Sequence, residues 1–493
     1  MINIPDVKLG IISVSRDCFP LTLSEKRRNA VHNQYKNKYG EIYNCNITVE
    51  NETQMLQAVG EIKKQDVNAL VVLLGNFGPE TPETLIAKYF EGPVMYAGAA
   101  EENIAVLSND RGDAYCGMLN CSYNLGVRNL KAYIPSHPIG TSDEIADMIE
   151  DFHCVARAFL GIRNLKIITF GPRPQDFIAC NAPIKPLFDL GVEIEENSEL
   201  DLYVAFKQHE NDIRIPDKVH EMESELGEGN KMPGILPKLA QYEITLLDIA
   251  NQHKGSCRFV AFANKCWPAF QTEFGFVPCY VNSRLTAMGI PVSCEVDIFG
   301  ALSEYIGTCI SGEAVTLLDI NNNVPNEMYE QKIAGRFNYK KDDTFMGFHC
   351  GNTPVCRLKK AIMKHHIIMK RTLEPNSEPN ITRGTLEGDI IPGDITLYRL
   401  QGNAKGELTA YIAQGEVLPI ATCSFGGIGV FAISEMGRFY RYVLIAKQYP
   451  HHAAVAFGKH GKALFSLFDY LGIEDIDYNK GSGVPYYNEN PFA

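Results

Sequence analysis

The first 110 residues alternate short apolar runs with amphipathic stretches, and this alternation restricts the possible folds more than any other feature of the sequence. The run 9–14 predicts a buried strand, and the stretch 24–39 after it predicts a helix. Asn51 is placed to cap a second helix, and 69–74 has the composition of a strand buried on both faces. Alternating strands and helices indicate a parallel, doubly wound sheet, so we expect a Rossmann-like α/β domain over residues 1–160.

A second α/β series follows the clearest predicted helix. Thr141 and Glu144 have the spacing of a capping box, and apolar residues then recur at helical spacing as far as Gly161. The pattern predicts strands at 166–170, 202–206 and 259–263 and a helix near 239–250. We therefore expect a second, central α/β domain over residues 161–310.

The pattern changes after residue 310. Short alternating stretches such as 395–400 and 408–412 are separated by Gly, Pro, Asn and Asp, which are typical of hairpin turns. We expect a mostly antiparallel, barrel-like β domain over residues 311–493, with a helix near 462–470.

Composition limits the possible partners and the compartment. The 46 basic and 59 acidic side chains leave a net charge of −13, which disfavours binding to nucleic acid or to an anionic membrane. No apolar run is long enough to cross a bilayer, and the first residues do not resemble a signal peptide. The 14 cysteines include no Cys-x-x-Cys pair, so we expect reduced thiols and a cytoplasmic protein.

Two acidic residues are the strongest candidates for catalysis. Glu273 follows the predicted strand 259–263, and Asp297 follows an expected strand at 291–294, at the strand ends where α/β sheets bind ligands. A crossover helix at 282–288 would bring the two carboxylates to one edge of the sheet, although 24 positions separate them. Glu295 would share the face of Asp297 if the strand continued. Alternatively, Asp297 is only a helix N-cap and Glu273 a solvated loop acid.

Other residues are candidates for binding a metal or a substrate. His451 and His452 begin a segment before the final helix, and two carboxylates with one imidazole would suit Mn²⁺, Mg²⁺ or Fe²⁺. His349 and Asn352 lie in a compact polar turn that either faces a pocket or is a plain loop. Trp267 would form the wall of a sugar pocket or would pack in the core.

The segment 266–306, the late His452 with Gly458, and the early stretch 8–17 together resemble the L-fucose isomerase and L-arabinose isomerase superfamily, and more closely the fucose branch. In that branch, two acids at this spacing and a late histidine hold Mn²⁺. The resemblance implies that Glu273, Asp297 and His452 are the metal ligands. Mg²⁺, Co²⁺ or Fe²⁺ are the substitutes that we expect for Mn²⁺.

The resemblance also implies an activity and an assembly. An open-chain aldose such as L-fucose, D-arabinose or L-arabinose would be converted into its ketose through an enediol, with Glu273 and Asp297 moving the proton between C1 and C2. The protein would be a homo-oligomer, with a hexamer as the expected assembly, in which Arg16 enters the active site of the neighbouring subunit.

The substrate stays open at the level of the sequence. Arg16 and Arg173 would hold an anionic group on a 6-substituted hexose such as sulfoquinovose, because guanidinium groups fit sulfonate oxygens, or they would bind neutral hydroxyls or serve the structure. A metal-dependent aldolase would need a phosphate cradle, which the sequence lacks. A metal-containing sugar-binding protein without catalytic activity is the remaining alternative.

Overall fold

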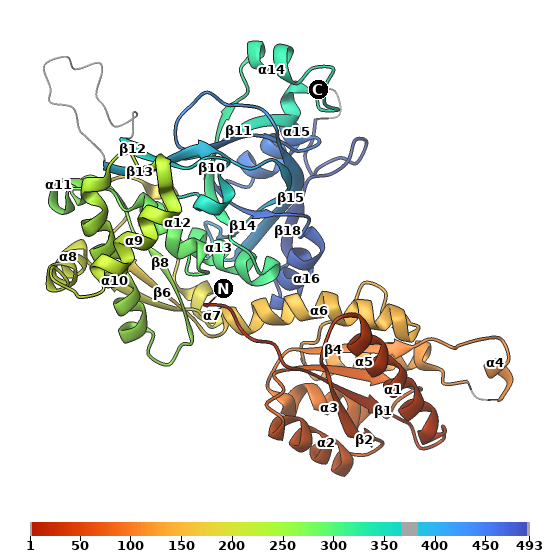
Figure 1. Ribbon diagram of the computed structural model, residues 1–493. Coiled ribbons are helices and arrows are strands. Elements are labelled where there is room, and N and C mark those ends of the chain that lie inside the picture. The colour runs from red at the N-terminus through yellow and green to blue at the C-terminus, as the bar shows by residue number, and fades with distance from the viewer. Residues whose placement is uncertain (1, 110, 366–382, 491–493) are drawn as a thin grey trace, which may run out of the picture. The chain divides into compact units, whose positions relative to one another are not determined.

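The computed structural model describes residues 2–109, 111–365 and 383–490, which form two compact units (Figure 1). The N-terminal unit consists of Pro5–Leu160 with Asp469–Gly472. The main unit consists of Met1–Ile4, Gly161–Phe468 and Ile473–Ala493. Among the described residues, no helix combines the length and the apolar character needed to span a bilayer.

The N-terminal unit is a parallel α/β sandwich. Its elements are β1 (Leu9–Val14), α1 (Leu21–Lys38), β2 (Tyr43–Val49), α2 (Glu52–Lys64), β3 (Ala69–Leu74), α3 (Glu80–Phe90), β4 (Val94–Ala99), α4 (Val106–Asn109), α5 (Ala114–Val127), β5 (Ile139–Gly140) and α6 (Ser142–Ile162). The strand order is β2-β1-β3-β4-β5, and all pairings are parallel. This confirms the predicted doubly wound fold.

Local signals in the sequence place two of these helices. The side chain of Asn51 accepts a hydrogen bond of 3.0 Å from the backbone N–H of Gln54 at the start of α2. The carboxylate of Glu144 accepts from the backbone N–H of Thr141 at 2.8 Å, and the Thr141 hydroxyl lies 3.4 Å from the backbone nitrogen of Glu144. Both groups satisfy backbone donors that a helix start leaves unpaired, as predicted.

The main unit begins with a smaller parallel sheet. Its elements are β6 (Leu165–Phe170), η1 (Ile178–Cys180), α7 (Lys185–Leu190), β7 (Glu193–Asn197), α8 (Glu199–Gln208), α9 (Ile215–Leu226), η2 (Gly227–Gly229), η3 (Pro233–Ile235), α10 (Leu236–His253), β8 (Phe259–Ala263), α11 (Phe270–Phe274), α12 (Cys279–Ala287), β9 (Val292–Ser293), η4 (Cys294–Val296) and α13 (Ile298–Ser311). The strand order is β7-β6-β8-β9, all parallel. The predicted second Rossmann-like sheet is confirmed.

One predicted strand of this sheet is wrong. Residues 202–206 belong to helix α8 and not to a strand, because Ser198 and Asp201 form a capping box that starts a helix there. The buried residues Leu202 and Phe206 are four positions apart, so they lie on one face of that helix.

The rest of the main unit is a β barrel with appended strands. Its elements are β10 (Thr316–Asn323), α14 (Asn326–Lys332), η5 (Lys341–Asp343), β11 (Thr344–His349), η6 (Val355–Arg357), β12 (Ile362–His365), β13 (Arg383–Asp389), β14 (Gly393–Gly402), β15 (Leu408–Leu418), β16 (Gly427–Ala432), α15 (Met436–Phe439), η7 (Tyr440–Ile445), β17 (His452–Phe457), α16 (Gly461–Leu471) and β18 (Asp475–Tyr478). The order β16-β11-β10-β17-β14-β15 closes into a ring, because β15 also pairs with β16. All six pairings are antiparallel, which confirms the barrel-like domain.

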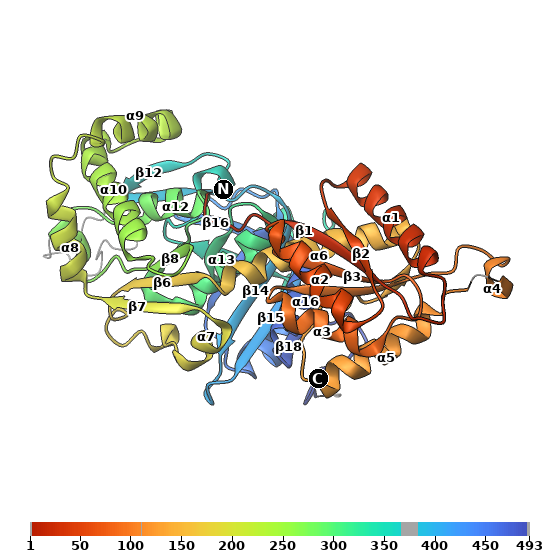
Figure 2. The ribbon, with the colours of Figure 1, turned by 90° about the horizontal axis from the view of Figure 1, so that it is seen from below.

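The longest strands of the barrel, β14 and β15, run side by side with β18 at their edge (Figure 2). Helix α13 connects the parallel sheet to this barrel and is buried along nearly its whole length. The Tyr398 hydroxyl of β14 donates a hydrogen bond of 2.8 Å to the backbone oxygen of Ser303 in α13. Sheet and barrel thus share one helix within the main unit, and the predicted boundary between a central and a C-terminal domain stays a prediction.

Candidate functional site

A cluster of acidic and imidazole side chains lies where three barrel strands meet the end of the parallel sheet. His452 is the first residue of β17, which lies between β10 and β14. Asp319 of β10 is directly opposite His452 in the strand register. Glu295 approaches from η4, which follows β9 at its carboxyl end. The cluster therefore combines the two kinds of sheet in the main unit.

Glu295 reaches this position through an unusual backbone conformation. Its φ is +60° and that of Val296 is +58°, a left-handed conformation that β-branched residues such as valine rarely adopt. The turn places Oε2 of Glu295 3.0 Å from Nε2 of His452, and Oδ1 of Asp319 lies 3.4 Å from the same nitrogen. Two carboxylates thus converge on one ring nitrogen.

The other nitrogen of His452 faces a different carboxylate. Nδ1 of His452 lies 2.8 Å from Oδ2 of Asp297 and 3.8 Å from the sulfur of Cys180. Asp297 caps helix α13, because its Oδ1 accepts a hydrogen bond of 2.8 Å from the backbone N–H of Gly300. Asp297 is therefore a helix N-cap, as the alternative from the sequence had it, and its predicted role as a metal ligand stays a prediction.

Two further histidines border the cluster. His349, at the end of β11, is buried, and its Nδ1 has no hydrogen-bond partner among the described residues. His451 is exposed, and its Nε2 lies 3.7 Å from Oδ1 of Asp319. Burial, followed by the positive charge of His452, lowers the pKa of His451 to about 4, whereas the Cys350 thiol and nearby carboxylates outweigh burial and raise the pKa of His349 to about 9.

The charges of the cluster suit a divalent cation. Asp297 is neutralised by Arg399, which leaves Glu295 and Asp319 as two carboxylates that face one imidazole. Burial raises the pKa of Asp319 to about 6, while contact with the His452 imidazole outweighs burial and holds the pKa of Glu295 below its usual value. Nε2 of His452 is paired with Oε2 of Glu295 at 3.0 Å. With a cation in place of the proton on Nε2 of His452, the two acids would offset a charge of two, so these residues fit a metal such as Mn²⁺ or Mg²⁺.

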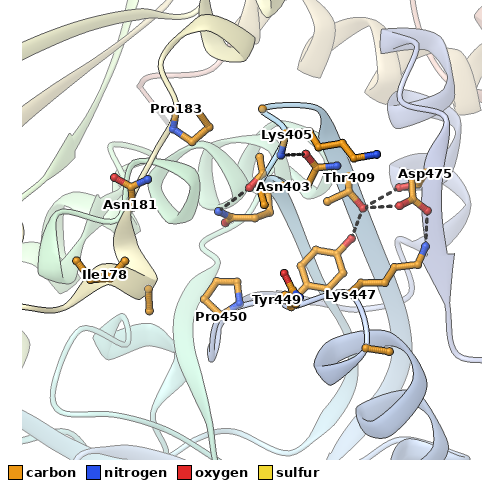
Figure 3. Close-up of a pocket in the computed structure, with 17 residues that line it drawn as sticks. Ile178, Asn181, Pro183, Asn403, Lys405, Thr409, Lys447, Tyr449, Pro450 and Asp475 are labelled. Atoms are coloured by element: carbon orange, nitrogen blue, oxygen red, sulfur yellow. Dashed lines mark hydrogen bonds and ion pairs between the residues drawn. The ribbon is translucent and has the colours of Figure 1, made fainter.

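A cavity of about 790 Å³ is lined by residues that neighbour the cluster in sequence but do not belong to it, and Figure 3 shows this lining. Tyr449 and Pro450 line it directly before His451, and Ile178 lines it directly after Phe177, whose ring contacts those of His451 and His452. The cavity is also lined by amide and ammonium groups, namely those of Asn181, Gln401, Asn403, Lys405, Lys447 and Gln448. Groups of this kind can bind the hydroxyls of a sugar.

The structure does not bring Glu273 into the cluster. This residue lies on the exposed side of α11 and is absent from every group of described residues whose ligand atoms are close enough to share an ion. A role for Glu273 with Asp297 stays a prediction. Among the described residues, Asp297 is grouped with Cys180 and His452, Glu295 with His451 and His452, and Asp319 with His349 and His452.

The remaining predicted residues lie at different distances from the cluster. Trp267 is half buried and packs against buried thiols that include Cys294, the residue before Glu295. Asn352 is buried and donates a hydrogen bond of 2.9 Å to the backbone oxygen of Val292 in β9. Their roles toward a substrate stay predictions.

The two predicted anion-binding arginines differ in their surroundings. Arg173 lies in loop 171–177, and its buried Nε has no hydrogen-bond partner within the described residues. Arg16 belongs to the N-terminal unit, where its guanidinium lies 3.7 Å from Glu80 and 5.0 Å from the centre of the Phe77 ring.

Asp319 is the acid that sequence reasoning missed. It lies within a strand, where nothing in the local pattern distinguishes it from other polar residues. The spacing along the chain distinguishes Asp319, because Glu295 and Asp319 are 24 positions apart, the same interval that separates Glu273 from Asp297. Searching for that interval throughout the chain would have produced both pairs.

Comparison with known proteins agrees with this architecture. Residues 10–163 match the family model "Fucose/sulfoquinovose isomerase, N-terminal domain", and residues 347–478 match "L-fucose isomerase, C-terminal domain". The sulfoquinovose isomerase of Alkalicoccus urumqiensis is 24% identical over 295 residues, which cover 58% of this chain and 60% of that protein. The sulfoquinovose isomerase of Priestia megaterium is 30% identical over 158 residues, which cover 31% of this chain and 33% of that protein.

The chain thus matches less than two thirds of the length of these relatives. The first family model describes an N-terminal domain and the second a C-terminal domain, and they match this chain in that order. Together they cover more than half of the chain. The chain belongs to the fucose isomerase superfamily.

Proposed function

We propose that this protein is an aldose-ketose isomerase that acts on sulfoquinovose, with a divalent cation held by Glu295, Asp319 and His452. One observation carries the proposal, namely the convergence of two carboxylates, 24 positions apart, on Nε2 of His452. Family membership supports the reaction class. This assignment moves the metal-ligand role from Glu273 and Asp297 to Glu295 and Asp319.

The two carboxylates divide the proton transfers of the reaction. One accepts the proton from C2 of the open-chain aldose and returns it to C1, and the other moves a proton from the C2 hydroxyl to the oxygen on C1, so that aldose and ketose balance through an enediol. When bound, the cation supplies the Lewis-acid polarisation of the carbonyl and acidifies the neighbouring hydroxyl. The resemblance to the fucose branch favours Mn²⁺ as this cation.

The choice of sulfoquinovose rests on the relatives and on Arg173. The curated relatives quoted above are named sulfoquinovose isomerase, a name that specifies a sugar with a sulfonate at C6. Loop 171–177 starts at Gly171, where an added Cβ would lie 2.9 Å from the Val296 side chain, and ends at Phe177, which contacts His451. Arg173 lies between these two anchors, and no ion pair involves it in the described part of the chain. Its guanidinium suits a sulfonate.

We also propose a homo-oligomer in which Arg16 of one subunit helps to close the site of the next, as the resemblance implies. Light scattering of the purified protein would give the mass of the assembly. A monomer with full activity would contradict this part of the proposal.

The deciding experiment measures ketose formation by metal-stripped protein with and without Mn²⁺. The sugars are sulfoquinovose, D-quinovose, which lacks the sulfonate, and L-fucose. We expect Mn²⁺-dependent turnover that is fastest with sulfoquinovose. Tight sugar binding without turnover of any of the three would favour the sugar-binding protein instead.

Variants separate the two pairs of acids. Glu295→Gln and Asp319→Asn remove an acid-base group and should each lower kcat by about 100-fold to 10,000-fold. Glu273→Gln is the matched control, because it makes the same change on an exposed helix and should leave kcat within about twofold of the wild type. The reverse pattern would restore Glu273 to the site and contradict the geometry proposed here.

A further inference from the structure

The buried pair of Asp297 and Arg399 has no assigned part in the site. Arg399 is 0% exposed, and its Nη1 and Nη2 donate hydrogen bonds of 2.8 Å and 2.9 Å to the two oxygens of Asp297. Nε of Arg399 donates to Oε1 of Gln401 at 2.8 Å, and its Nη1 also lies 3.2 Å from the backbone oxygen of His452. One guanidinium thus holds both the carboxylate and the backbone of the histidine beside it.

The partners of Asp297 leave it little capacity to bind a cation. Oδ1 accepts from Gly300 and Arg399, and Oδ2 accepts from Arg399 and faces Nδ1 of His452. A carboxylate with its lone pairs used in this way, and with its charge offset by arginine, is a poor metal ligand. It is well suited to accept a hydrogen bond from an imidazole.

We propose that Asp297 and Arg399 are positioning residues, which fix the His452 ring with a proton on Nδ1 and with Nε2 directed at Glu295 and Asp319. The inference rests on the proposed function, because it concerns the ligand role of His452. A hydrogen bond from one ring nitrogen to a carboxylate fixes the tautomer and the orientation of a metal-binding imidazole and makes the other nitrogen more basic.

The fold explains why two residues are needed for this task. His452 is at the start of β17, with β10 on one side and β14, which carries Arg399, on the other. Asp297 comes from the start of α13 and would be a buried, uncompensated charge without Arg399. The pair therefore connects the helix to the barrel at the position where the ring must be held still.

The test compares the affinity for Mn²⁺ in two variants that each break a buried ion pair with an arginine. Asp297→Asn breaks the pair next to His452, and Glu243→Gln breaks the pair of Glu243 with Arg284, in which Glu243 is 0% exposed and which lies on helices α10 and α12. We expect electron paramagnetic resonance of free Mn²⁺ to give a dissociation constant that is about 10-fold to 100-fold higher for Asp297→Asn. The constant for Glu243→Gln should equal that of the wild type.

The outcomes distinguish the inference from the proposed function. If the folded wild type binds no divalent cation, both are overturned. If the wild type binds Mn²⁺ and folded Asp297→Asn binds it equally well, the positioning role is overturned and the proposed function stands. A purely structural role would lower the melting temperature of both variants and leave both affinities unchanged.

A second measurement applies if Asp297→Asn does not fold. Nitrogen NMR of wild-type protein with isotope-labelled histidine and bound Zn²⁺ reports which ring nitrogen carries the proton, and the His452 signals are assigned by their loss in His452→Gln. We expect the proton on Nδ1 and the cation on Nε2. A proton on Nε2 would overturn the inference.

Discussion

Arg173 is the side chain that we propose to select the substrate. Its loop is fixed at both ends near the cluster, and within the described residues no acidic group forms an ion pair with it. Because Arg173 has no ion-pair partner among those residues, its guanidinium can bind an anionic ligand without breaking an existing ion pair. Arg16 would first have to break its ion pair with Glu80. Arg173 is therefore the residue whose replacement should discriminate a sulfonated sugar from a neutral one.

We predict that Arg173→Met raises KM for sulfoquinovose by about 10-fold to 100-fold, because a hydrogen bond to a charged group contributes about 1.5 to 3 kcal/mol. The values of KM for D-quinovose should stay within about twofold, since that sugar has no sulfonate. Steady-state kinetics with both sugars provide the measurement. The control Arg336→Met removes an equal charge from an exposed position. Equal losses for both sugars would mean that Arg173 serves the structure and not the recognition of an anion.

At the scale of elements, the contact of helix α13 with strand β14 depends on a glycine. A Cβ added to Gly307 would lie 1.7 Å from the hydroxyl oxygen and 2.8 Å from Cζ of Tyr398. That hydroxyl is hydrogen bonded to Ser303 of the same helix, so the ring cannot move without breaking a buried bond. The close approach is needed because Asp297 is the N-cap of α13, so the position of this helix determines where that carboxylate lies.

We predict that Gly307→Ala lowers the free energy of unfolding by about 1 to 3 kcal/mol, the usual cost of inserting an atom into a packed core. Gly60, inside helix α2, is the matched control, because an added Cβ there meets nothing within 4 Å. Gly60→Ala should raise stability by about 0.5 to 1 kcal/mol through the better helix propensity of alanine. Urea unfolding followed by circular dichroism measures both, and a stabilising Gly307→Ala would refute the packing argument.

Elements with a local cause could be predicted from the sequence, and those with a distant cause could not. The capping groups Asn51 and Thr141 act within a few residues, so their helices were predicted. The segment 202–206 has the apolar character of a short strand, and only the capping box before it identifies a helix. Asp319 became a candidate only when the pairing of β10 with β17 placed it opposite His452, a contact across more than a hundred residues.

At the scale of the whole molecule, each unit has its own buried core and its own buried acid. Glu83 in the N-terminal unit is 0% exposed, and its carboxylate contacts the Cys121 thiol but forms no ion pair with a described residue. Burial raises the pKa of Glu83 to about 8. The single tryptophan, Trp267, belongs to the main unit, so its fluorescence follows that unit alone, whereas circular dichroism follows both.

The raised pKa of Glu83 makes the stability of the N-terminal unit depend on pH. The folded unit keeps a proton that the unfolded chain releases above its ordinary pKa of 4.5, so the contribution to stability is complete below about pH 4.5 and is lost as the pH rises to about 8. Glu83→Gln has no such proton and should be more stable than the wild type at pH 9, by roughly a few kcal/mol. At pH 5 this advantage over the wild type should be smaller. The exposed Glu41→Gln, in the same unit, should unfold like the wild type at both values. Urea unfolding by circular dichroism should show this difference, while the Trp267 fluorescence transition should not, and equal pH dependences in wild type and Glu83→Gln would contradict a proton held at Glu83.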